Sequence, residues 1–185
     1  MPTLLEPPAL AARAERIQLV LFDVDGVLTD GTVLYHSDGS ESKRFNIRDG
    51  IAMVWTQRAG LTVGILSARF SATTTHRAAQ LGIALVHQGV ADKREAYELI
   101  LEETGATDDV VAYMADDILD LPVLSRVGLA ACPSDAAREV RERVHWISPS
   151  PGGGGAAREL LEVVLKAQRR WDPIVATFTR EESPA

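Results

Sequence analysis

The chain has 185 residues, of which 46% are hydrophobic and 24% are charged. This composition is typical of a folded protein of about one domain, and it argues against a disordered chain. It also argues against a membrane protein, because no apolar run approaches the roughly 20 residues of a membrane-spanning helix. The formal net charge of −7 disfavours nucleic acid as a partner, since phosphate backbones repel an acidic protein.

In chain order, the pattern predicts a flexible N-terminal arm over residues 1–16, which are rich in alanine and proline. The continuous apolar run Ile17–Phe22 is then typical of a buried parallel strand. The segments Thr32–His36 and Ser42–Asn46 flank an Asp38–Gly39 turn. This arrangement predicts a β-hairpin inserted after the first strand.

The rest of the chain alternates between apolar runs and amphipathic segments, which predicts strands separated by helices. Such units imply an α/β fold, a doubly wound (Rossmann-like) parallel sheet with helices on both faces. We expect one domain over residues 17–170 and a mobile C-terminal tail over residues 171–185. The predicted strands are Leu61–Leu66, Ile83–His87, Val110–Met114, Val127–Ala131 and Val144–Ile147. The longer predicted helices are Gly50–Ala59, Ser71–Leu81 with Ser71 as N-cap, Asp92–Glu103 ended by Gly105, and Ala156–Arg169.

Ligands of such sheets bind beyond the carboxyl ends of the strands, so the residues that follow each strand are the candidates for chemistry. Here they offer carboxylates, a hydroxyl and an ammonium group. The candidates are Asp23 and Asp25 after the first strand, Ser67 after the second, Lys93 after the third, and Asp116, Asp117 and Asp120 after the fourth.

Carboxylates gathered at one sheet edge predict a metal site. Two unit charges about 4 Å apart repel each other by about 4 kcal/mol at an effective dielectric constant of 20. A hard divalent cation removes this repulsion, and oxygen-only ligands favour Mg²⁺. Asp23 and Asp116 fit the role of ligands, while Lys93 and Ser67 would hold the phosphoryl oxygens of a substrate.

The Asp-Val-Asp sequence predicts a pair of reacting carboxylates. In an extended segment, Asp23 and Asp25 point to the same side. One can attack phosphorus to give an acyl phosphate, and the other can protonate the leaving oxygen and later activate water. Gly26 permits a sharp turn of the backbone after them. An aspartate after a strand can also cap a helix, so the prediction depends on the joint arrangement.

These residues resemble the haloacid dehalogenase-like phosphohydrolase superfamily over residues 17–165. Asp23 with Asp25, Ser67, Lys93, and Asp116 with Asp120 look like its four motifs. The longer strings DVDGVLTDG, YHSDGSESKRFNIRDG, GVADKREA, ADDILDLPVL and GGGGAARE resemble the 3-deoxy-D-manno-octulosonate 8-phosphate phosphatase family. The resemblance implies a fold without a cap domain, a need for Mg²⁺, and a homotetramer with the hairpin near its centre.

The resemblance also implies roles for single residues. By motif position, Asp23 would be nucleophile and metal ligand, and Asp116 a further ligand, with Asp117 and Asp120 beside them. Asp25 would be the acid and base, would contact the substrate, and would bind the metal through its backbone carbonyl. Lys93 would contact the substrate phosphate.

Two arginines, Arg69 and Arg77, match positions that face the substrate in similar enzymes. A bidentate arginine suits a carboxylate, although a solvated arginine on a helix face is an equal alternative for Arg77. Two departures from the family pattern stand out. The family usually has Thr-Gly where this chain has Ser67-Ala68, and it usually has glycine where this chain has Ala115. Serine keeps the hydroxyl group, but the Ala115 methyl would crowd the loop if the backbone there had a positive φ.

The sequence therefore predicts a Mg²⁺-dependent phosphomonoester hydrolase that acts on a phosphorylated sugar acid through an aspartyl-phosphate intermediate. The alternatives are a phosphatase for nine-carbon sialic-type acid 9-phosphates, or a non-catalytic assembly subunit of a sugar-acid nucleotidyltransferase. The retained Asp25 argues against the latter. The run Gly152–Gly155 is expected to be either a flexible hinge or the start of a tail that reaches a neighbouring active site.

We expect the chain to associate with itself and with no nucleic acid or membrane. The single cysteine, Cys132, cannot form an internal disulfide, which favours a reducing compartment. The first nine residues contain Glu6 and lack a basic segment, so they do not resemble a secretory signal. Together these features predict a cytoplasmic protein.

Overall fold

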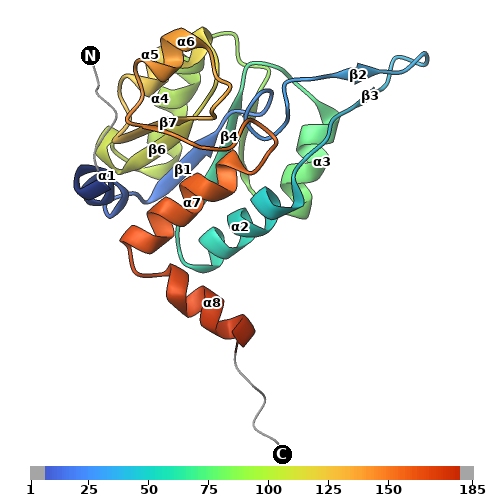
Figure 1. The fold of residues 1–185 in the computed structure, drawn as a ribbon. Coiled ribbons are helices and arrows are strands. Elements are labelled where there is room, and N and C mark those ends of the chain that lie inside the picture. The colour runs from blue at the N-terminus through green and yellow to red at the C-terminus, as the bar shows by residue number, and fades with distance from the viewer. Residues whose placement is uncertain (1–6, 180–185) are drawn as a thin grey trace, which may run out of the picture.

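In the computed structural model, which describes residues 7–179, a parallel sheet lies between two layers of helices (Figure 1). The six strands are arranged in the order β5-β4-β1-β6-β7-β8, and all neighbours pair in parallel. The predicted doubly wound parallel fold is therefore confirmed. The strands are β1 (Leu19–Phe22), β4 (Thr62–Ser67), β5 (Leu85–Gln88), β6 (Val111–Met114), β7 (Leu129–Cys132) and β8 (Trp146–Ile147).

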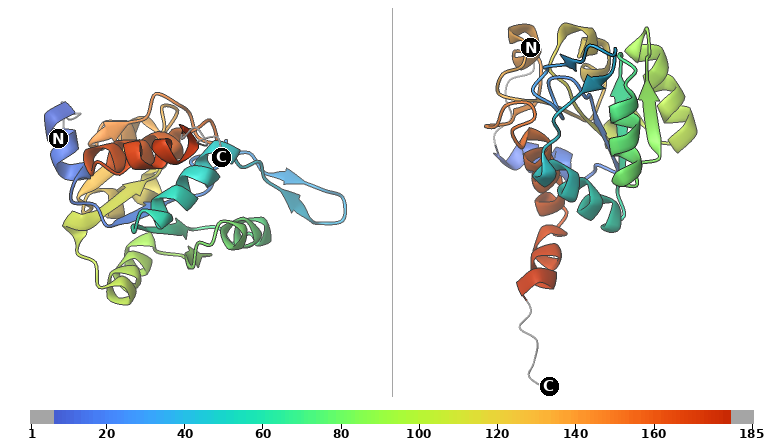
Figure 2. Two further views of the ribbon diagram at one scale, coloured as in Figure 1. Left: turned by 90° about the horizontal axis from the view of Figure 1, so that it is seen from below. Right: turned by 90° about the vertical axis from the view of Figure 1, so that its right-hand side faces the viewer.

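The helices cover both faces of the sheet, with α2 and α7 on one face and α4 on the other (Figure 2). The α-helices are α1 (Pro7–Ala14), α2 (Ile47–Arg58), α3 (Ala72–Gln80), α4 (Lys93–Thr104), α5 (Leu121–Leu124), α6 (Arg138–Arg141), α7 (Ala156–Ala167) and α8 (Trp171–Thr179). Two 3-10 helices, η1 (Asp108–Val110) and η2 (Ile118–Asp120), lie before and after β6.

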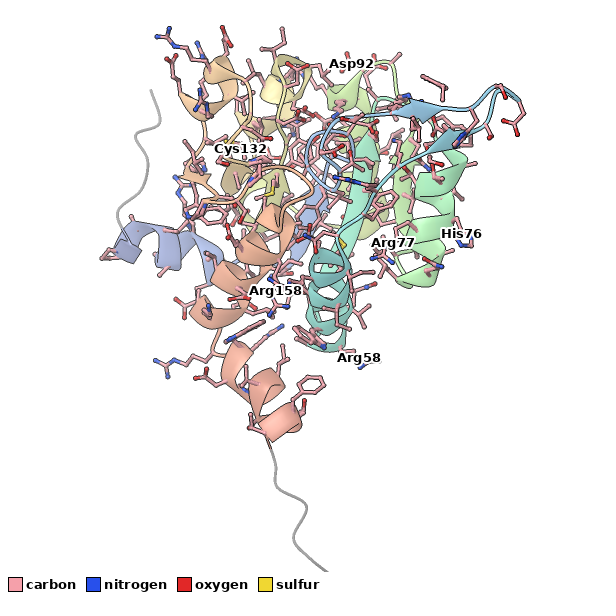
Figure 3. All side chains as sticks on the ribbon, turned by 45° about the vertical axis from the view of Figure 1, so that its right-hand side comes forward. Arg58, His76, Arg77, Asp92, Cys132 and Arg158 are labelled. Atoms are coloured by element: carbon pink, nitrogen blue, oxygen red, sulfur yellow. The ribbon has the colours of Figure 1, made fainter. Side chains whose placement is uncertain are left out.

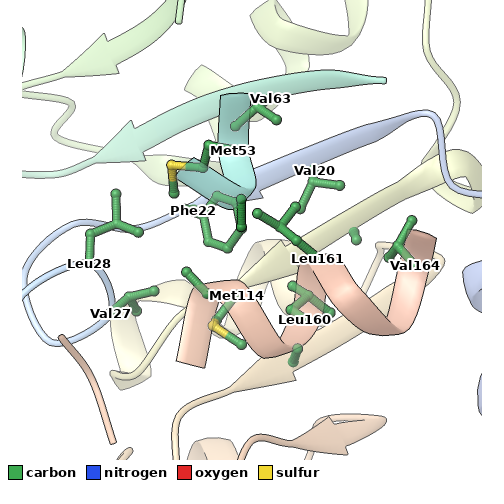
Figure 4. Close-up of a cluster of buried hydrophobic side chains, with 14 of the residues drawn as sticks. Val20, Phe22, Val27, Leu28, Met53, Val63, Met114, Leu160, Leu161 and Val164 are labelled. Atoms are coloured by element: carbon green, nitrogen blue, oxygen red, sulfur yellow. The ribbon is translucent and has the colours of Figure 1, made fainter. Parts of the chain in front are cut away.

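Strand β1 shows why this sequence forms a sheet with two buried faces. Val20 and Phe22 point into the core cluster beneath α2 and α7, where Phe22 lies near Met53 and Leu161 (Figure 4). Leu19 and Leu21 point into the second cluster, on the face that carries α4. All four side chains are almost fully buried, as a continuous apolar run predicts.

Side chains at the helix ends explain where the helices begin and end. Ser71 caps α3 and Asp92 caps α4, and Gly105 ends α4 with a left-handed φ of 67°, all as the sequence predicts. Helix α2 begins at Ile47, earlier than predicted, because the side chain of Asn46 accepts a hydrogen bond from the backbone N of Arg48 at 2.8 Å.

The hairpin is present as predicted, but its strands are shorter. Strands β2 (Leu34–Tyr35) and β3 (Glu41–Ser42) pair antiparallel and form a two-stranded sheet of their own. The hairpin projects from the body of the molecule (Figure 1). Its connection to the domain therefore depends on side chains and loops rather than on the main sheet.

The predicted arm and tail each contain a helix. Helix α1 lies against α7, where Gln168 Nε2 donates to Ala14 O at 3.1 Å. Helix α8 follows α7, and the Trp171 ring lies 6.0 Å from the ring of Trp55 on α2. The guanidinium of Arg158 lies over both of these rings, at the junction of α2, α7 and α8 (Figure 3). Residues 1–6 and 180–185 lie outside the described residues, and the domain boundaries at 17 and 170 stay predictions.

Candidate active site

The site forms at the switch point of the sheet, where the chain adds strands first on one side of β1 and then on the other. Asp23 follows β1 directly, and its backbone N donates to Met114 O of β6 at 3.0 Å. Its carboxylate is 7% exposed and accepts a hydrogen bond from Val24 N at 2.7 Å. Ser67 ends the neighbouring strand β4 and is buried at the same edge of the sheet.

Asp116, which follows β6, packs directly against the loop after β1. A Cβ at Gly26 would lie 2.0 Å from Asp116 Oδ2, and Gly26 has a φ of 83°. Both the close approach and the left-handed backbone require glycine at this position. The sequence Asp-x-Asp-Gly therefore brings Asp23 and Asp116 together from two strands that are distant in the chain.

Lys93, the first residue of α4, is held inside a buried network of charges and hydroxyls. Its Nζ lies 2.9 Å from Asp23 Oδ2, contacts the Asp120 carboxylate, and lies 3.2 Å from the Tyr113 hydroxyl. The Tyr113 hydroxyl also donates to Asp120. Because Lys93 and Asp120 are both almost fully buried, the ammonium group has a fixed place beside Asp23.

Three carboxylates, those of Asp23, Asp116 and Asp120, each place an oxygen within 4.8 Å of the others. Burial raises the pKa of Asp23 to about 6, although Lys93 opposes the change. Burial, together with repulsion from Asp23 and Asp120, raises the pKa of Asp116 to about 7. A divalent cation would offset both the repulsion and the burial cost, and an oxygen-only donor set fits Mg²⁺.

Asp25 lies between two cations from different segments. The Nζ of Lys43 is 2.6 Å from Asp25 Oδ1, and the Nη1 of Arg69 is 3.9 Å from Asp25 Oδ2. Lys43 follows β3 of the hairpin, and its side chain is fully buried. The sequence reasoning missed this lysine. Alternation along an extended strand places Glu41 and Lys43 on one side, but it does not define what that side faces.

Arg69 links the site to the hairpin. Its guanidinium pairs with the Glu41 carboxylate and donates to the Tyr35 hydroxyl at 3.0 Å. Glu41 also accepts hydrogen bonds from the hydroxyls of Ser71 and Thr73. The hydrogen bond from Ser71, followed by that from Arg69, lowers the pKa of Glu41. We call the contacts of Glu41 with Arg69, Ser71 and Thr73 the Glu41 clamp.

Two other predicted site residues lie apart from these groups. Asp117 caps η2 by accepting from Ile118 N at 2.7 Å, and its side chain is exposed. Arg77, on α3, lies over the Phe45 ring and points toward the start of α2 (Figure 3). A Cβ at Gly50 would meet its Nη2 at 2.3 Å. The predicted roles of Asp117 and Arg77 stay predictions.

The tetraglycine packs tightly at its start. A Cβ at Gly152 would lie 1.9 Å from Gly26 O, and one at Gly153 would lie 2.8 Å from Asp30 N. In addition, Gly153 N donates to Val27 O at 2.9 Å. These two glycines therefore support the loop after β1 by close backbone contact, which neither of the two expectations for this run included.

Ala115 is accommodated without backbone strain. Among residues 7–179, the only residue other than glycine with a positive φ is Arg169. Ala115 is fully buried, and its backbone N donates to Ala131 O at 3.2 Å. The methyl group that replaces the family's usual glycine thus needs no left-handed conformation.

A parallel sheet with this switch point, a cluster of three carboxylates and a buried lysine defines a haloacid dehalogenase-like hydrolase. Comparison with known proteins supports this class. No family model matches the chain. The chain is 36% identical over 165 residues to the 3-deoxy-D-manno-octulosonate 8-phosphate phosphatase of Salmonella typhimurium, which covers 89% of this chain and 88% of the relative.

Solved structures give the same result. A probable YrbI family phosphatase from Pseudomonas syringae has a TM-score of 0.92 and 40% identity, covering 95% of this chain and 99% of that one. The 3-deoxy-D-manno-octulosonate 8-phosphate phosphatase of Moraxella catarrhalis, in complex with magnesium, phosphate and the sugar acid, has a TM-score of 0.90 and 34% identity, covering 92% and 98%.

The chain therefore belongs to the 3-deoxy-D-manno-octulosonate 8-phosphate phosphatase family. It is a phosphoric monoester hydrolase, as the sequence predicts. The predicted cofactor, Mg²⁺, is the ion that the carboxylates of Asp23 and Asp116 fit.

Proposed function

We propose that the chain hydrolyses 3-deoxy-D-manno-octulosonate 8-phosphate, or a closely similar phosphorylated sugar acid, through an aspartyl phosphate on Asp23. The observation that carries this proposal is the buried Lys93 ammonium, 2.9 Å from Asp23 and fixed by Asp120, at the sheet edge that also holds Asp116. A fixed cation beside a carboxylate both orients the nucleophile and attracts a phosphoryl group. The names of the similar proteins support the choice of substrate.

The reaction proceeds in two displacements at phosphorus. An oxygen of Asp23 forms a bond to phosphorus while the bond to the sugar oxygen breaks, and Asp25 gives that oxygen its proton. Asp25 then takes a proton from water, whose oxygen attacks phosphorus and releases Asp23 and inorganic phosphate. Lys93 and Ser67 hold the phosphoryl oxygens throughout.

Asp23, Asp116 and the backbone carbonyl of Asp25 would hold Mg²⁺, which when bound supplies positive charge against the phosphoryl group and the carboxylates. Asp120 has a different role, because its carboxylate already pairs with Lys93 and accepts a hydrogen bond from Tyr113. It keeps the lysine in place for the substrate.

For the substrate carboxylate, Arg69 is better placed than Arg77. The Arg69 guanidinium lies at the edge of the site, 3.9 Å from Asp25, and arginine suits a carboxylate through its paired N–H groups. Arg77 contacts Phe45 and the start of α2 instead. We assign Arg77 to the support of that helix start, and the substrate carboxylate to Arg69.

We also propose a homotetramer joined through the hairpin. Leu34 and Tyr35 are 58% and 68% exposed at the projecting hairpin, and exposed apolar residues grouped on such a feature favour association. The tetramer itself follows from the family resemblance.

The cytoplasm is the proposed location, supported by Cys132, a buried free thiol whose pKa is raised by burial to about 12. Within residues 7–179, every helix is too short or too polar to cross a bilayer.

A phosphate-release assay tests the proposed function. The panel contains the eight-carbon acid 8-phosphate, a nine-carbon acid 9-phosphate and a hexose 6-phosphate, each with Mg²⁺ and with EDTA. We expect Mg²⁺-dependent turnover with kcat/KM highest for the eight-carbon ester by about tenfold or more, the scale that a few specific contacts supply. Preference for the nine-carbon ester would favour that alternative, and no turnover of any ester would contradict the proposal.

A further inference from the structure

We infer that Lys43 is a positioning residue, whose ammonium group holds the Asp25 carboxyl in the orientation that transfers a proton to the leaving oxygen. The inference rests on the proposed function and deepens it. Lys43 directly follows β3 and reaches the site from the hairpin rather than from the main sheet. Its Nζ lies 2.6 Å from Asp25 Oδ1.

The burial of Lys43 distinguishes it from its neighbour on the hairpin. The Lys43 side chain is fully buried, whereas that of Arg44 is 89% exposed and pairs with Asp30 at the surface. A buried ammonium group is unfavourable unless it is paired. Asp25 is the partner, so the folded hairpin and the orientation of this carboxyl depend on each other.

The two oxygens of Asp25 are held from opposite segments. Lys43 contacts Oδ1 from the hairpin, and Arg69 faces Oδ2 from the loop after β4. The close ion pair with Lys43 restricts rotation of the carboxyl, and general acid catalysis depends on such alignment. Lys43 has the shorter contact, so its removal frees the carboxyl most.

The Glu41 clamp explains how the hairpin brings Lys43 to this place. The hairpin forms its own two-stranded sheet, and Glu41 ties it to Arg69, Ser71 and Thr73 beside the start of α3. Lys43 lies two residues after Glu41, on the same side of the extended chain. The clamp therefore fixes the register that inserts the lysine next to Asp25.

Two esters with different leaving groups distinguish a positioning role of Lys43 from a role in substrate binding. A sugar alkoxide needs a proton to leave, whereas p-nitrophenolate leaves without one. A lysine that orients the acid lowers kcat/KM, which reports the first displacement, far more for the sugar ester than for p-nitrophenyl phosphate. The parameter kcat also contains the second displacement, in which Asp25 acts as base for both esters. A lysine that binds the phosphoryl group lowers kcat/KM for both esters alike.

The experiment measures kcat and KM of Lys43→Met and Lys43→Arg with the sugar acid phosphate and with p-nitrophenyl phosphate, at saturating Mg²⁺. For Lys43→Met we expect kcat/KM to fall about a hundredfold with the sugar ester, the scale of general acid catalysis, and less than about threefold with p-nitrophenyl phosphate. Lys43→Arg restores most of the loss. The matched control is Arg44→Met, which changes an exposed cation one position away and leaves both reactions unchanged.

Equal losses of kcat/KM with both esters would overturn the inference. If Lys43→Met does not fold, Lys43→Gln keeps a neutral polar group beside Asp25, and the same selectivity for the sugar ester is expected at smaller size. If the wild-type protein prefers another alkyl phosphate, the proposed substrate fails, and Lys43 is tested with that ester instead.

Discussion

Two ionic networks meet at the active site, and they differ in how the chain supports them. The sheet network consists of four almost fully buried residues, Asp23 after β1, Lys93 at the start of α4, Tyr113 in β6 and Asp120 at the end of η2. The hairpin network consists of Asp25, Lys43, Glu41 and Arg69, where side-chain exposure reaches 33% at Arg69. Its hairpin residues belong to no strand of the main sheet.

This difference predicts that substitutions in the two networks have different effects on stability and activity. Removing one member of a buried network leaves an uncompensated charge and destabilises the fold, whereas exposed ion pairs contribute little to stability. The sheet network should therefore couple activity to stability. In the hairpin network, the partly exposed pair of Glu41 and Arg69 should affect catalysis while leaving the fold intact.

The largest effect on activity is expected for Asp23→Asn. The amide cannot form an acyl phosphate, so kcat should fall by about a thousandfold or more. The measurement is phosphate release, combined with trapping of the phosphoryl protein on rapid acid quench. Residual activity within about tenfold of the wild-type value would contradict the role of Asp23 as nucleophile.

The next effect, and the sharpest test of the comparison, is expected for Asp120→Asn. Asp120 shares Lys93 with Asp23 in the buried network, so its loss should lower the free energy of unfolding by about 3 kcal/mol. The freed lysine should lower kcat by about a hundredfold. Urea unfolding and kinetics measure the two effects. A change in one without the other would break the proposed coupling.

A smaller effect is expected for Glu41→Gln in the hairpin network. Because the Glu41 clamp is partly exposed, the free energy of unfolding should change by less than about 1 kcal/mol. We expect kcat/KM with the sugar ester to fall about tenfold, as misplacement of catalytic groups produces. The control is Asp38→Asn at the exposed hairpin turn. A large loss of stability would show that both networks support the fold alike.

The smallest effect on activity is expected for Asp49→Asn, because Asp49 belongs to neither network. This variant tests how the burial of a carboxyl away from Lys93 makes stability depend on pH. Asp49 is 3% exposed and accepts from Arg158 N at 2.9 Å, and burial raises its pKa to about 6. The folded state then binds the proton more tightly than the unfolded state, so stability falls as pH rises from about 4 to about 6 and is level above. Relative to Asp49→Asn, the wild-type protein should lose up to about 3 kcal/mol across this range. Urea unfolding at several pH values checks the difference, which vanishes if Asp49 ionises as it does in water.

The sequence predicts the sheet network far better than the hairpin network, for a physical reason. Strand ends are visible as apolar runs that stop at polar residues, and parallel pairing gathers those ends at one edge. Asp23, Lys93 and Asp116 were therefore predictable. Lys43 and the Glu41 clamp were not, because they depend on how two short strands fold back over the site, which turn signals alone do not define.

Caps and glycines show the same limit. The N-cap at Ser71 follows from local sequence, whereas Asn46, an equally good N-cap residue, falls at the end of the predicted hairpin segment Ser42–Asn46. The close packing of Gly152 against Gly26 joins segments far apart in the chain, and a run of glycines looks flexible when only neighbours in sequence are considered.

That contact between Gly152 and the loop after β1 has a consequence for biosynthesis. During translation the first strand and its two aspartates emerge early, but the backbone that supports their loop emerges only with residues 152–153. A nascent chain shorter than this can pair its strands while its catalytic loop stays unsupported. The enzyme should thus become competent only after residues 152–153 have emerged, which chains that end at residue 150 and at residue 179 would reveal by their contrasting resistance to protease around Gly26.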